Sequence, residues 1–327
     1  MNLFDMIITR PMGFIIEHIY GFVQNYGWAI IIFTVLIKLV VLPLTVKSQK
    51  AMKKQQKVQP YIAELQKKYA NDQQKLQQEM MKVYKENNIS MAGGCLPMLI
   101  QMPILVGLYQ VIQKPLQFLL GVDFNLPESI DKVLHLQSAI QQAGENIGNL
   151  ASSTMEQLAN MSQIQLSSWS AKINGLGDPW AINFNFLGLD LSNVPMTGLT
   201  ALISGNFSAG ALSMLIIPIV AVSTTFVVSK LTQWQQKWND KKNGVTSANT
   251  ADTGAAAATS GAMMWMMPIM TGFFTLTLPS GLGIYWIISN AVQIVQQVGL
   301  DMYFNKKGDE FDVKLPEANR KKGKKRK

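Results

Sequence analysis

The sequence predicts an all-α, polytopic membrane protein with five transmembrane helices and a cytoplasmic helical hairpin after the first of them. Three observations predict this class. The 327-residue chain is 48% hydrophobic and only 15% charged. Several apolar stretches have the length of about 20 residues that crosses roughly 30 Å of hydrocarbon. Basic residues gather in the segments that this topology leaves on one side of the membrane.

The first predicted span, 28–46, has Lys38 near its centre. A lysine at the middle of a span costs on the order of 3 kcal/mol, and such residues usually face a water-filled cavity or a partner instead of lipid. We therefore expect a helix bundle with a hydrophilic interior. Residues 1–27 are expected to form an interfacial N-terminal helix. We expect no cleavable signal within them, because Arg10, Pro11 and Glu17 interrupt the apolar run.

Residues 47–92 are polar, lysine-rich and helical in pattern, which predicts the cytoplasmic hairpin. A turn and helix cap are expected at Asn71 and Asp72. The apolar stripes of its two arms are Val58, Ile62, Leu65 and Tyr69, and Leu76, Met80, Val83 and Tyr84.

The other predicted segments follow from apolar length and polar composition. They are a second span at 96–114, an extracytoplasmic loop at 115–211, a third span at 212–231, a flexible cytoplasmic linker at 232–261, a fourth span at 262–278, a fifth at 282–299 and a basic cytoplasmic tail at 300–327. Within the loop, apolar spacing suggests two amphipathic helices, near 130–150 and 155–173.

Charge fixes the predicted orientation. Residues 47–92 hold 10 basic and 4 acidic residues, and 301–327 hold 10 and 5, whereas 115–211 hold 2 and 7. Because basic segments stay in the cytoplasm, the N-terminus is expected outside and the C-terminus inside.

The chain lacks the usual enzyme signatures, including phosphate-binding glycine loops, HExxH, GxSxG and paired metal ligands. We therefore expect a non-enzyme with no cofactor, no metal and no DNA partner. Polar residues in the spans are instead expected to line a hydrophilic groove, although for most of them helix-to-helix hydrogen bonding is an alternative. These candidates are Lys38, Thr34, Gln101, Gln110, Thr224, Thr225, Asn290 and Gln293.

Two further surfaces are candidates for contact with partners. Met263, Met264, Met266 and Met267 offer an adaptable apolar surface, with lipid contact as the alternative. The tail residues suited to ribosomal RNA or anionic lipids are Arg320, Lys321, Lys322, Lys324, Lys325, Arg326 and Lys327. Topology alone also demands cytoplasmic basic clusters, so the tail by itself does not indicate RNA binding.

Three stretches resemble the YidC family of membrane protein insertases. They are GWAIIIFTVLIKLVVLPLTVKSQKAMKKQQKVQPYIAELQKKY, KVYKENNISMAGGCLPMLIQMPILVGLYQVI and LPSGLGIYWIISNAVQIVQQ. The similarity covers roughly residues 10–115 and 212–300. It implies the short five-span bacterial form in the plasma membrane, without a large periplasmic domain.

The resemblance also implies a function. Family members insert hydrophobic segments of nascent membrane proteins through a groove open to cytoplasm and lipid, alone or with the Sec translocon. The implied cytoplasmic partners are the ribosome and targeting factors of the SRP pathway. The groove charge is usually arginine, and the matching position here is Lys38. Lysine keeps the positive charge but lacks the planar guanidinium group.

Two rival interpretations stay open. A small transporter or channel for an anionic solute would use Lys38 as a counter-ion and predicts matching repeated halves, which the sequence does not show. An assembly scaffold would need only the hairpin and the tail.

Overall fold

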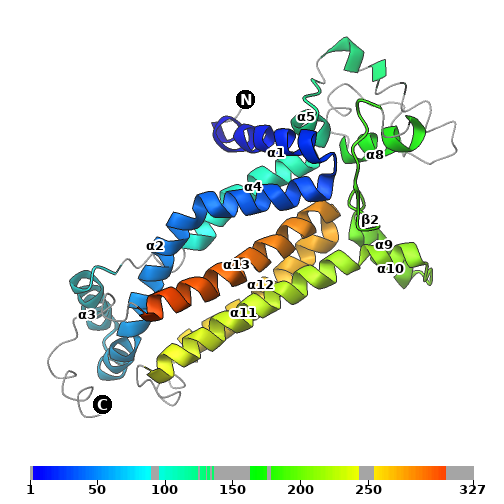
Figure 1. Cartoon of the computed structure of the whole chain (residues 1–327). Helices are drawn as coiled ribbons and strands as arrows, with labels where there is room; N and C mark the ends of the chain where they lie inside the picture. The colour runs from blue at the N-terminus through cyan, green and yellow to red at the C-terminus, as the bar shows by residue number, and fades with distance from the viewer. Residues whose placement is uncertain are drawn as a thin grey trace. The chain divides into compact units, whose positions relative to one another are not determined.

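The computed structural model describes residues 3–89, 96–123, 126–129, 131–132, 135, 163–174, 178–242 and 254–306, which are mainly helical (Figure 1). The elements in chain order are a π-helix η1 (Asp5–Thr9), α1 (Arg10–Val23), α2 (Tyr26–Lys68), α3 (Gln73–Glu86), α4 (Leu96–Gln113), α5 (Pro115–Leu119), α8 (Gln163–Asn174), β1 (Asn185–Phe186), β2 (Leu189–Asp190), α9 (Pro195–Ile203), α10 (Ala209–Met214), α11 (Ile216–Lys242), α12 (Gly254–Thr277) and α13 (Ser280–Lys306).

The chain forms two compact units. The first unit takes in 1–37, 101–223 and 270–289, and the second takes in 38–100, 224–269 and 290–327. Each of the long helices α2, α4, α11, α12 and α13 contributes residues to both units.

A sharp corner in the first unit separates α1 from α2. Gln24 adopts a left-handed conformation (φ 51°), and its N–H donates to the carbonyl of Tyr20 over 2.8 Å. This is a common way to end a helix, because it satisfies a carbonyl that has no partner within the helix. The chain can then start α2 in a new direction at Tyr26.

The core of the first unit joins α1 and α2 to segments far along the chain. α1 packs against α5, and α5 packs against α8. Ile16, Ile30 and Phe33 are fully buried in the same apolar cluster as Leu108 and Ile164. Van der Waals packing among these side chains holds the helices of the unit together.

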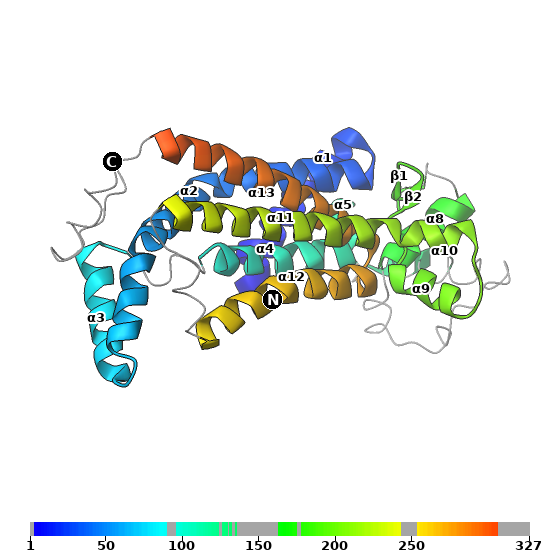
Figure 2. The same cartoon turned by 90° about the horizontal axis from the view of Figure 1, so that it is seen from below.

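A short antiparallel hairpin, β1–β2, lies in the segment predicted as a polar loop (Figure 2). Its two-residue turn, Leu187 and Gly188, has positive φ at both positions (53° and 80°), as the right-handed twist of a tight hairpin favours. The hairpin packs closely on α2, because a Cβ atom placed on Gly27 would lie 2.4 Å from the Phe186 ring. A larger residue at Gly27 would displace the hairpin.

The second unit pairs the C-terminal half of α2 with α3 (Figure 2). The apolar stripes predicted on these helices meet in one cluster that includes Val58, Ile62, Leu76 and Val83. Asp72 caps α3, because its carboxylate accepts the N–H of Lys75 over 3.0 Å. The helical pair therefore has an apolar core of its own.

Several helices extend beyond the predicted segment boundaries. α2 continues without a break past residue 46, and α11 continues to Lys242, so the predicted linker is helical at both of its ends. The third predicted span is interrupted at Leu215, between α10 and α11. A change from apolar to Lys- and Gln-rich sequence ends a membrane span but not a helix, since both residues favour helix. Most of the predicted loop helices at 130–150 and 155–173 lie outside the described residues, except for α8.

Candidate functional site

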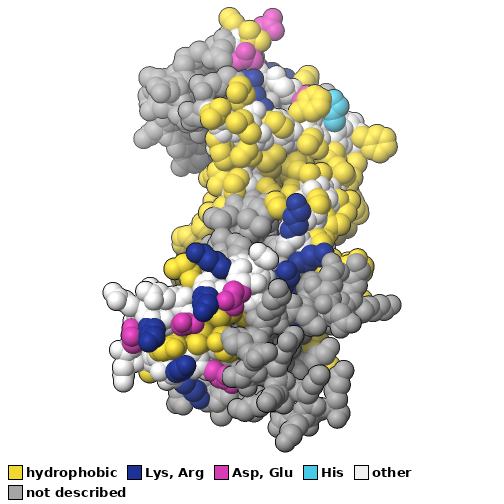
Figure 3. All heavy atoms as spheres, turned by 90° about the vertical axis from the view of Figure 1, so that its left-hand side faces the viewer, with side chains coloured by type: hydrophobic (Ala, Val, Ile, Leu, Met, Phe, Trp, Pro, Cys, Tyr) yellow, Lys and Arg dark blue, Asp and Glu magenta, His cyan; other side chains and the backbone are white. Residues whose placement is uncertain are grey.

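The long helices carry an apolar exterior. Exposed large apolar side chains include Val40, Ile219, Ile269, Phe273 and Val295, each more than 60% exposed. Hydrophobic side chains also cover much of the face in Figure 3. Among the described residues, the stretches Tyr26–Val58 and Ala209–Gln235 are long and apolar enough to cross a membrane. Exposed apolar surface on this scale is typical of helices in contact with lipid.

Two of the predicted groove residues lie one turn apart on α2. Thr34, in the first unit, is fully buried, and its hydroxyl donates to the carbonyl of Ile30 over 2.6 Å. Lys38, in the second unit, is half-buried, and its backbone carbonyl accepts from the side chain of Gln296 over 3.4 Å. Thr34 therefore satisfies its hydroxyl within its own helix, as threonines in apolar helices often do.

In the second unit, two sets of polar contacts join the apolar helices, Gln296 with the carbonyl of Lys38 and Asn290 with Thr224 and Thr225. We call these five residues the polar layer. The Asn290 amide donates to Thr224 Oγ1 over 3.1 Å and to Thr225 Oγ1 over 2.8 Å, which joins α13 to α11. Asn290 and Thr225 are each 7% exposed. The layer thus gathers four of the predicted groove residues on three helices.

Gln293 is the remaining groove candidate of the second unit. Its side chain is exposed. No hydrogen bond is seen from its side chain to any other residue in the described part of the chain. Gln293 is therefore a matched, non-buried comparison for Asn290 on the same helix.

The groove candidates of the first unit have specific partners there. The Gln101 amide donates to the hydroxyl of Tyr285, which is 2% exposed. Gln110 accepts a hydrogen bond of 2.9 Å from Thr9, a fully buried residue at the end of η1. Both glutamines hold helices together, which is the alternative that sequence reasoning left open for them.

Sequence reasoning missed a second polar cluster, which joins α2, α11 and α13 in the second unit. Gln297 donates to Thr232 Oγ1 over 3.1 Å and to Gln235 Oε1 over 2.7 Å. Lys53 Nζ lies 2.5 Å from the carboxylate of Asp301. One signal for this cluster is present in the sequence, because Asn290, Gln293 and Gln297 follow the spacing of one helical face.

The predicted partner surfaces are only partly described. Met266 and Met267 are 56% and 45% exposed on α12. The side chains of Met263 and Met264, and the tail residues 320–327, lie outside the described part of the chain. The two exposed methionines suit contact with lipid or with an apolar partner.

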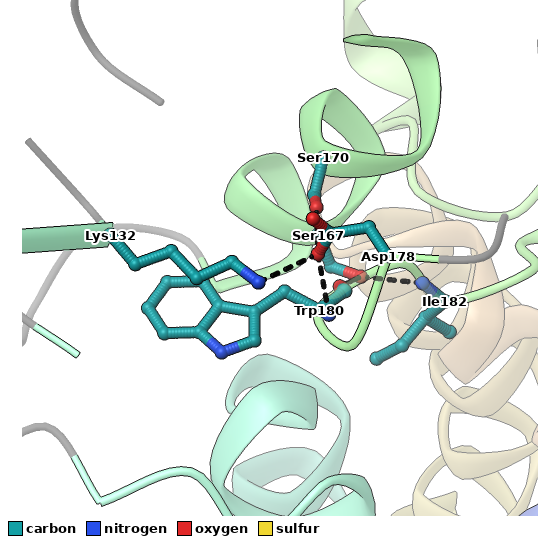
Figure 4. A network of polar contacts seen from close by, with 6 residues as sticks. All are labelled: Lys132, Ser167, Ser170, Asp178, Trp180 and Ile182. Atoms are coloured by element: carbon teal, nitrogen blue, oxygen red, sulfur yellow. Dashed lines mark hydrogen bonds and ion pairs between the residues drawn. The ribbon is translucent and has the colours of Figure 1, made fainter. Parts of the chain in front are cut away.

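A third polar network secures α8 in the first unit (Figure 4). One carboxylate oxygen of Asp178 accepts from Ser170 Oγ (2.7 Å) and the Trp180 N–H (2.8 Å), and lies 3.0 Å from Lys132 Nζ. Ser167 donates to the carbonyl of Trp180 over 2.6 Å and accepts the Ile182 N–H over 2.9 Å.

Burial raises the pKa of Asp178, but the bonds from Ser170, Trp180 and Lys132 outweigh it and hold the pKa below its usual value. Burial likewise raises the pKa of Tyr20 in α1, partly offset by the N–H of Asn183. Among the described residues, no three His, Cys, Asp or Glu side chains are grouped to hold a metal ion. The hydrogen bonds of Asp178, Ser167 and Tyr20 stabilise the fold of the first unit.

The geometry defines a helical membrane protein that places a lysine and a buried polar layer among apolar helices. A model of the family described as 60Kd inner membrane protein matches residues 18–307. A YidC membrane protein insertase of Clostridium perfringens (strain 13 / Type A) is 32% identical over 297 residues, which cover 90% of this chain and 87% of that relative.

Longer relatives match as well. The YidC proteins of Nitratidesulfovibrio vulgaris (strain DSM 19637 / Miyazaki F) and Pelodictyon phaeoclathratiforme (strain DSM 5477 / BU-1) are 29% and 28% identical over 89% and 95% of this chain. The chain spans only 37% and 39% of their respective lengths. The protein belongs to the 60Kd inner membrane protein family, the family of the YidC membrane protein insertases, which confirms the resemblance found in the sequence.

Proposed function

We propose that this protein is a membrane protein insertase that moves hydrophobic segments of newly made proteins into the bacterial plasma membrane, alone or with the Sec translocon. Membership of the YidC family supports this function. The observation that carries the mechanism is the polar layer of the second unit. Buried polar groups are expensive in a lipid-facing bundle, so we assign Lys38, Thr224 and Asn290 to a hydrophilic groove that receives the substrate.

The proposed topology has five spans, formed by α2, α4, α11, α12 and α13. At 1.5 Å per residue, the 18, 24 and 27 residues of α4, α12 and α13 extend about 27, 36 and 40 Å, close to or beyond the 30 Å of hydrocarbon. The charge pattern supports an N-terminus outside, with the α2–α3 pair and the C-terminus in the cytoplasm.

In this mechanism, the groove shortens the distance over which a substrate's polar tail must cross hydrocarbon. An uncompensated polar group costs several kcal/mol in an apolar medium, and polar side chains in the groove offset part of that cost. The Lys38 ammonium attracts acidic groups in the tail. Burial of the substrate's apolar segment in lipid then drives the step, and no nucleotide is required.

We assign contacts at the cytoplasmic face to three surfaces. The α2–α3 pair is the proposed receiver of incoming chains, of the ribosome and of targeting factors of the SRP pathway. The basic tail, 320–327, is assigned to ribosomal RNA or anionic lipids. Met266 and Met267 offer a soft apolar surface for varied substrate segments, as methionine-rich surfaces do elsewhere.

An anion transporter is the second candidate function, and it too would use Lys38. The two functions are separated by reconstituting the purified chain in liposomes. The first assay follows protease protection of a single-span substrate with an acidic tail, and the second follows uptake of a labelled anion. An insertase protects the substrate tail without anion uptake above empty liposomes. Uptake without protection would overturn the proposed function.

A further inference from the structure

The cluster of Lys53, Asp301, Gln297 and Phe304 connects two helices beyond the expected edge of the membrane. Lys53 lies 15 residues after Lys38 on α2, so it is about 22 Å further along the helix. Half of a 30 Å hydrocarbon layer is about 15 Å. With Lys38 near the middle of the span, Lys53 therefore lies past the hydrocarbon, between the span and the part of α2 that packs on α3.

The contacts of Lys53 are partly shielded from water. Its ammonium lies 2.5 Å from Asp301, and the two side chains are only 14% and 24% exposed. The same ammonium lies 5.9 Å from the centroid of the Phe304 ring, which is 2% exposed. A partly desolvated ion pair with a cation–π contact is stronger than the average surface pair.

Gln297 connects α13 to α11, and one of its two polar side-chain atoms has no hydrogen-bond partner among the described residues. Its amide nitrogen donates hydrogen bonds to Thr232 and Gln235. Its Oε1 is buried and accepts no hydrogen bond from the described residues. A cavity of about 20 Å³ lies beside it, lined by Lys53, Asp301, Gln56 and other polar residues. This volume suffices for one water molecule, and water is the usual partner of an unsatisfied buried acceptor.

We propose that Lys53, Asp301 and Gln297, with one internal water, form a polar clasp that fixes the outgoing arm of α2 against α13 and α11. The clasp holds the α2–α3 pair in the orientation that receives substrate, so Lys53 and Asp301 are positioning residues for insertion. The assignment of a role in insertion rests on the proposed function, whereas the mechanical role of the clasp does not.

The test measures the position of α3 and the rate of insertion in the same reconstituted full-length protein. Spin labels are placed at Gln77→Cys on α3 and Val295→Cys on α13, both exposed positions, in a Cys95→Ser background. We expect a narrow distance distribution in the parent and a broad one in Lys53→Met. Insertion by Lys53→Met is expected to fall by roughly threefold or more.

Two variants keep the test specific. The reversed pair, Lys53→Asp with Asp301→Lys, is expected to restore both the narrow distribution and the insertion rate. Lys54→Met removes a neighbouring charge on the same helix that makes no ion pair within the described residues, and it should change neither quantity. An unchanged distribution in Lys53→Met would overturn the clasp. A broad distribution with full insertion would overturn its positioning role.

A chain lacking residues 58–89 separates the two levels of the proposal. If this shortened chain inserts at the parental rate, the role assigned to the α2–α3 pair fails. The spin-label distances measured in the full-length protein still decide whether the clasp exists. The internal water is tested directly by an experimental map that resolves waters. Density within hydrogen-bonding distance of Gln297 Oε1 is expected, and an empty cavity would contradict the hydrated clasp.

Discussion

The amide of Asn290 donates to the hydroxyl of Thr225 over 2.8 Å, and both side chains are 7% exposed. This bond connects α13 to α11 within the polar layer. Buried hydrogen bonds between membrane helices are worth about 0.6 kcal/mol on average and up to roughly 1.7. Asn290 makes two of them, which sets the scale for the first prediction.

Replacing Asn290 with Ala should lower the free energy of unfolding by about 1–2 kcal/mol, because both threonine hydroxyls lose a donor. The measurement is reversible unfolding in mixed micelles. Gln293→Ala, on an exposed side chain of the same helix, should change it by less than about 0.5 kcal/mol. Equal effects of the two substitutions would show that the polar layer adds no stability.

Gly283→Ala should destabilise the first unit by about 1–3 kcal/mol through overpacking. A Cβ atom at Gly283 would lie 2.4 Å from Cγ2 of Ile217. Thermal unfolding of Gly283→Ala is compared with Gly299→Ala, where nothing lies within 4 Å. Combining Gly283→Ala with Ile217→Ala should cost less than the sum of the two single substitutions, and strictly additive effects would place the clash elsewhere.

The acid sensitivity of the first unit should depend on Asp178. Its pKa is lowered in the folded protein, so its contribution to stability is present above the unfolded pKa of about 3.9 and is lost as pH falls through the folded pKa. At pH 7, Asp178→Asn should lower Tm by roughly 2–4 °C. The difference from the parent should shrink as pH falls below the unfolded pKa of about 3.9 and through the lowered folded pKa. A difference that does not change with pH would exclude ionisation as the source.

The α2–α3 pair should separate when its apolar cluster is broken. Val58 is fully buried in that cluster, so Val58→Asp places a carboxylate among apolar side chains. We expect amide hydrogen exchange in α3 to rise at least about tenfold, while exchange in α13 stays unchanged. Gln77→Asp, on the exposed face of α3, is the control. Retained protection in Val58→Asp would mean that other contacts hold α3.

Much of this arrangement follows from local sequence patterns. The lysine within an apolar run, the two stripes that meet around Val58 and Val83, and the cap at Asp72 depend on residues close together in the chain. The contact of Thr9 with Gln110 joins residues 101 positions apart, and no local period predicts it. The β1–β2 hairpin is only four paired residues long, too short for an alternating pattern to be recognised.

The polar residues of the second unit also differ in how far the sequence predicts them. Asn290 and Thr224 were predicted from their polarity within apolar spans, and the structure joins them. Lys53 and Asp301 belong to segments rich in charge, where nothing in the sequence distinguishes a residue of the clasp from a solvated one. Only the fold brings that pair together.

In the proposed mechanism, the charge on Lys38 assists the passage of acidic substrate tails. The most direct measurement is insertion of a single-span substrate with an acidic outer tail into liposomes that contain the purified protein, Lys38→Ala or Lys38→Arg. We predict that the parent and Lys38→Arg insert the substrate, while Lys38→Ala is slower by about tenfold or more. A substrate with a neutral tail should insert nearly equally with all three. Equal insertion of the acidic substrate by the parent and Lys38→Ala would contradict the proposed mechanism.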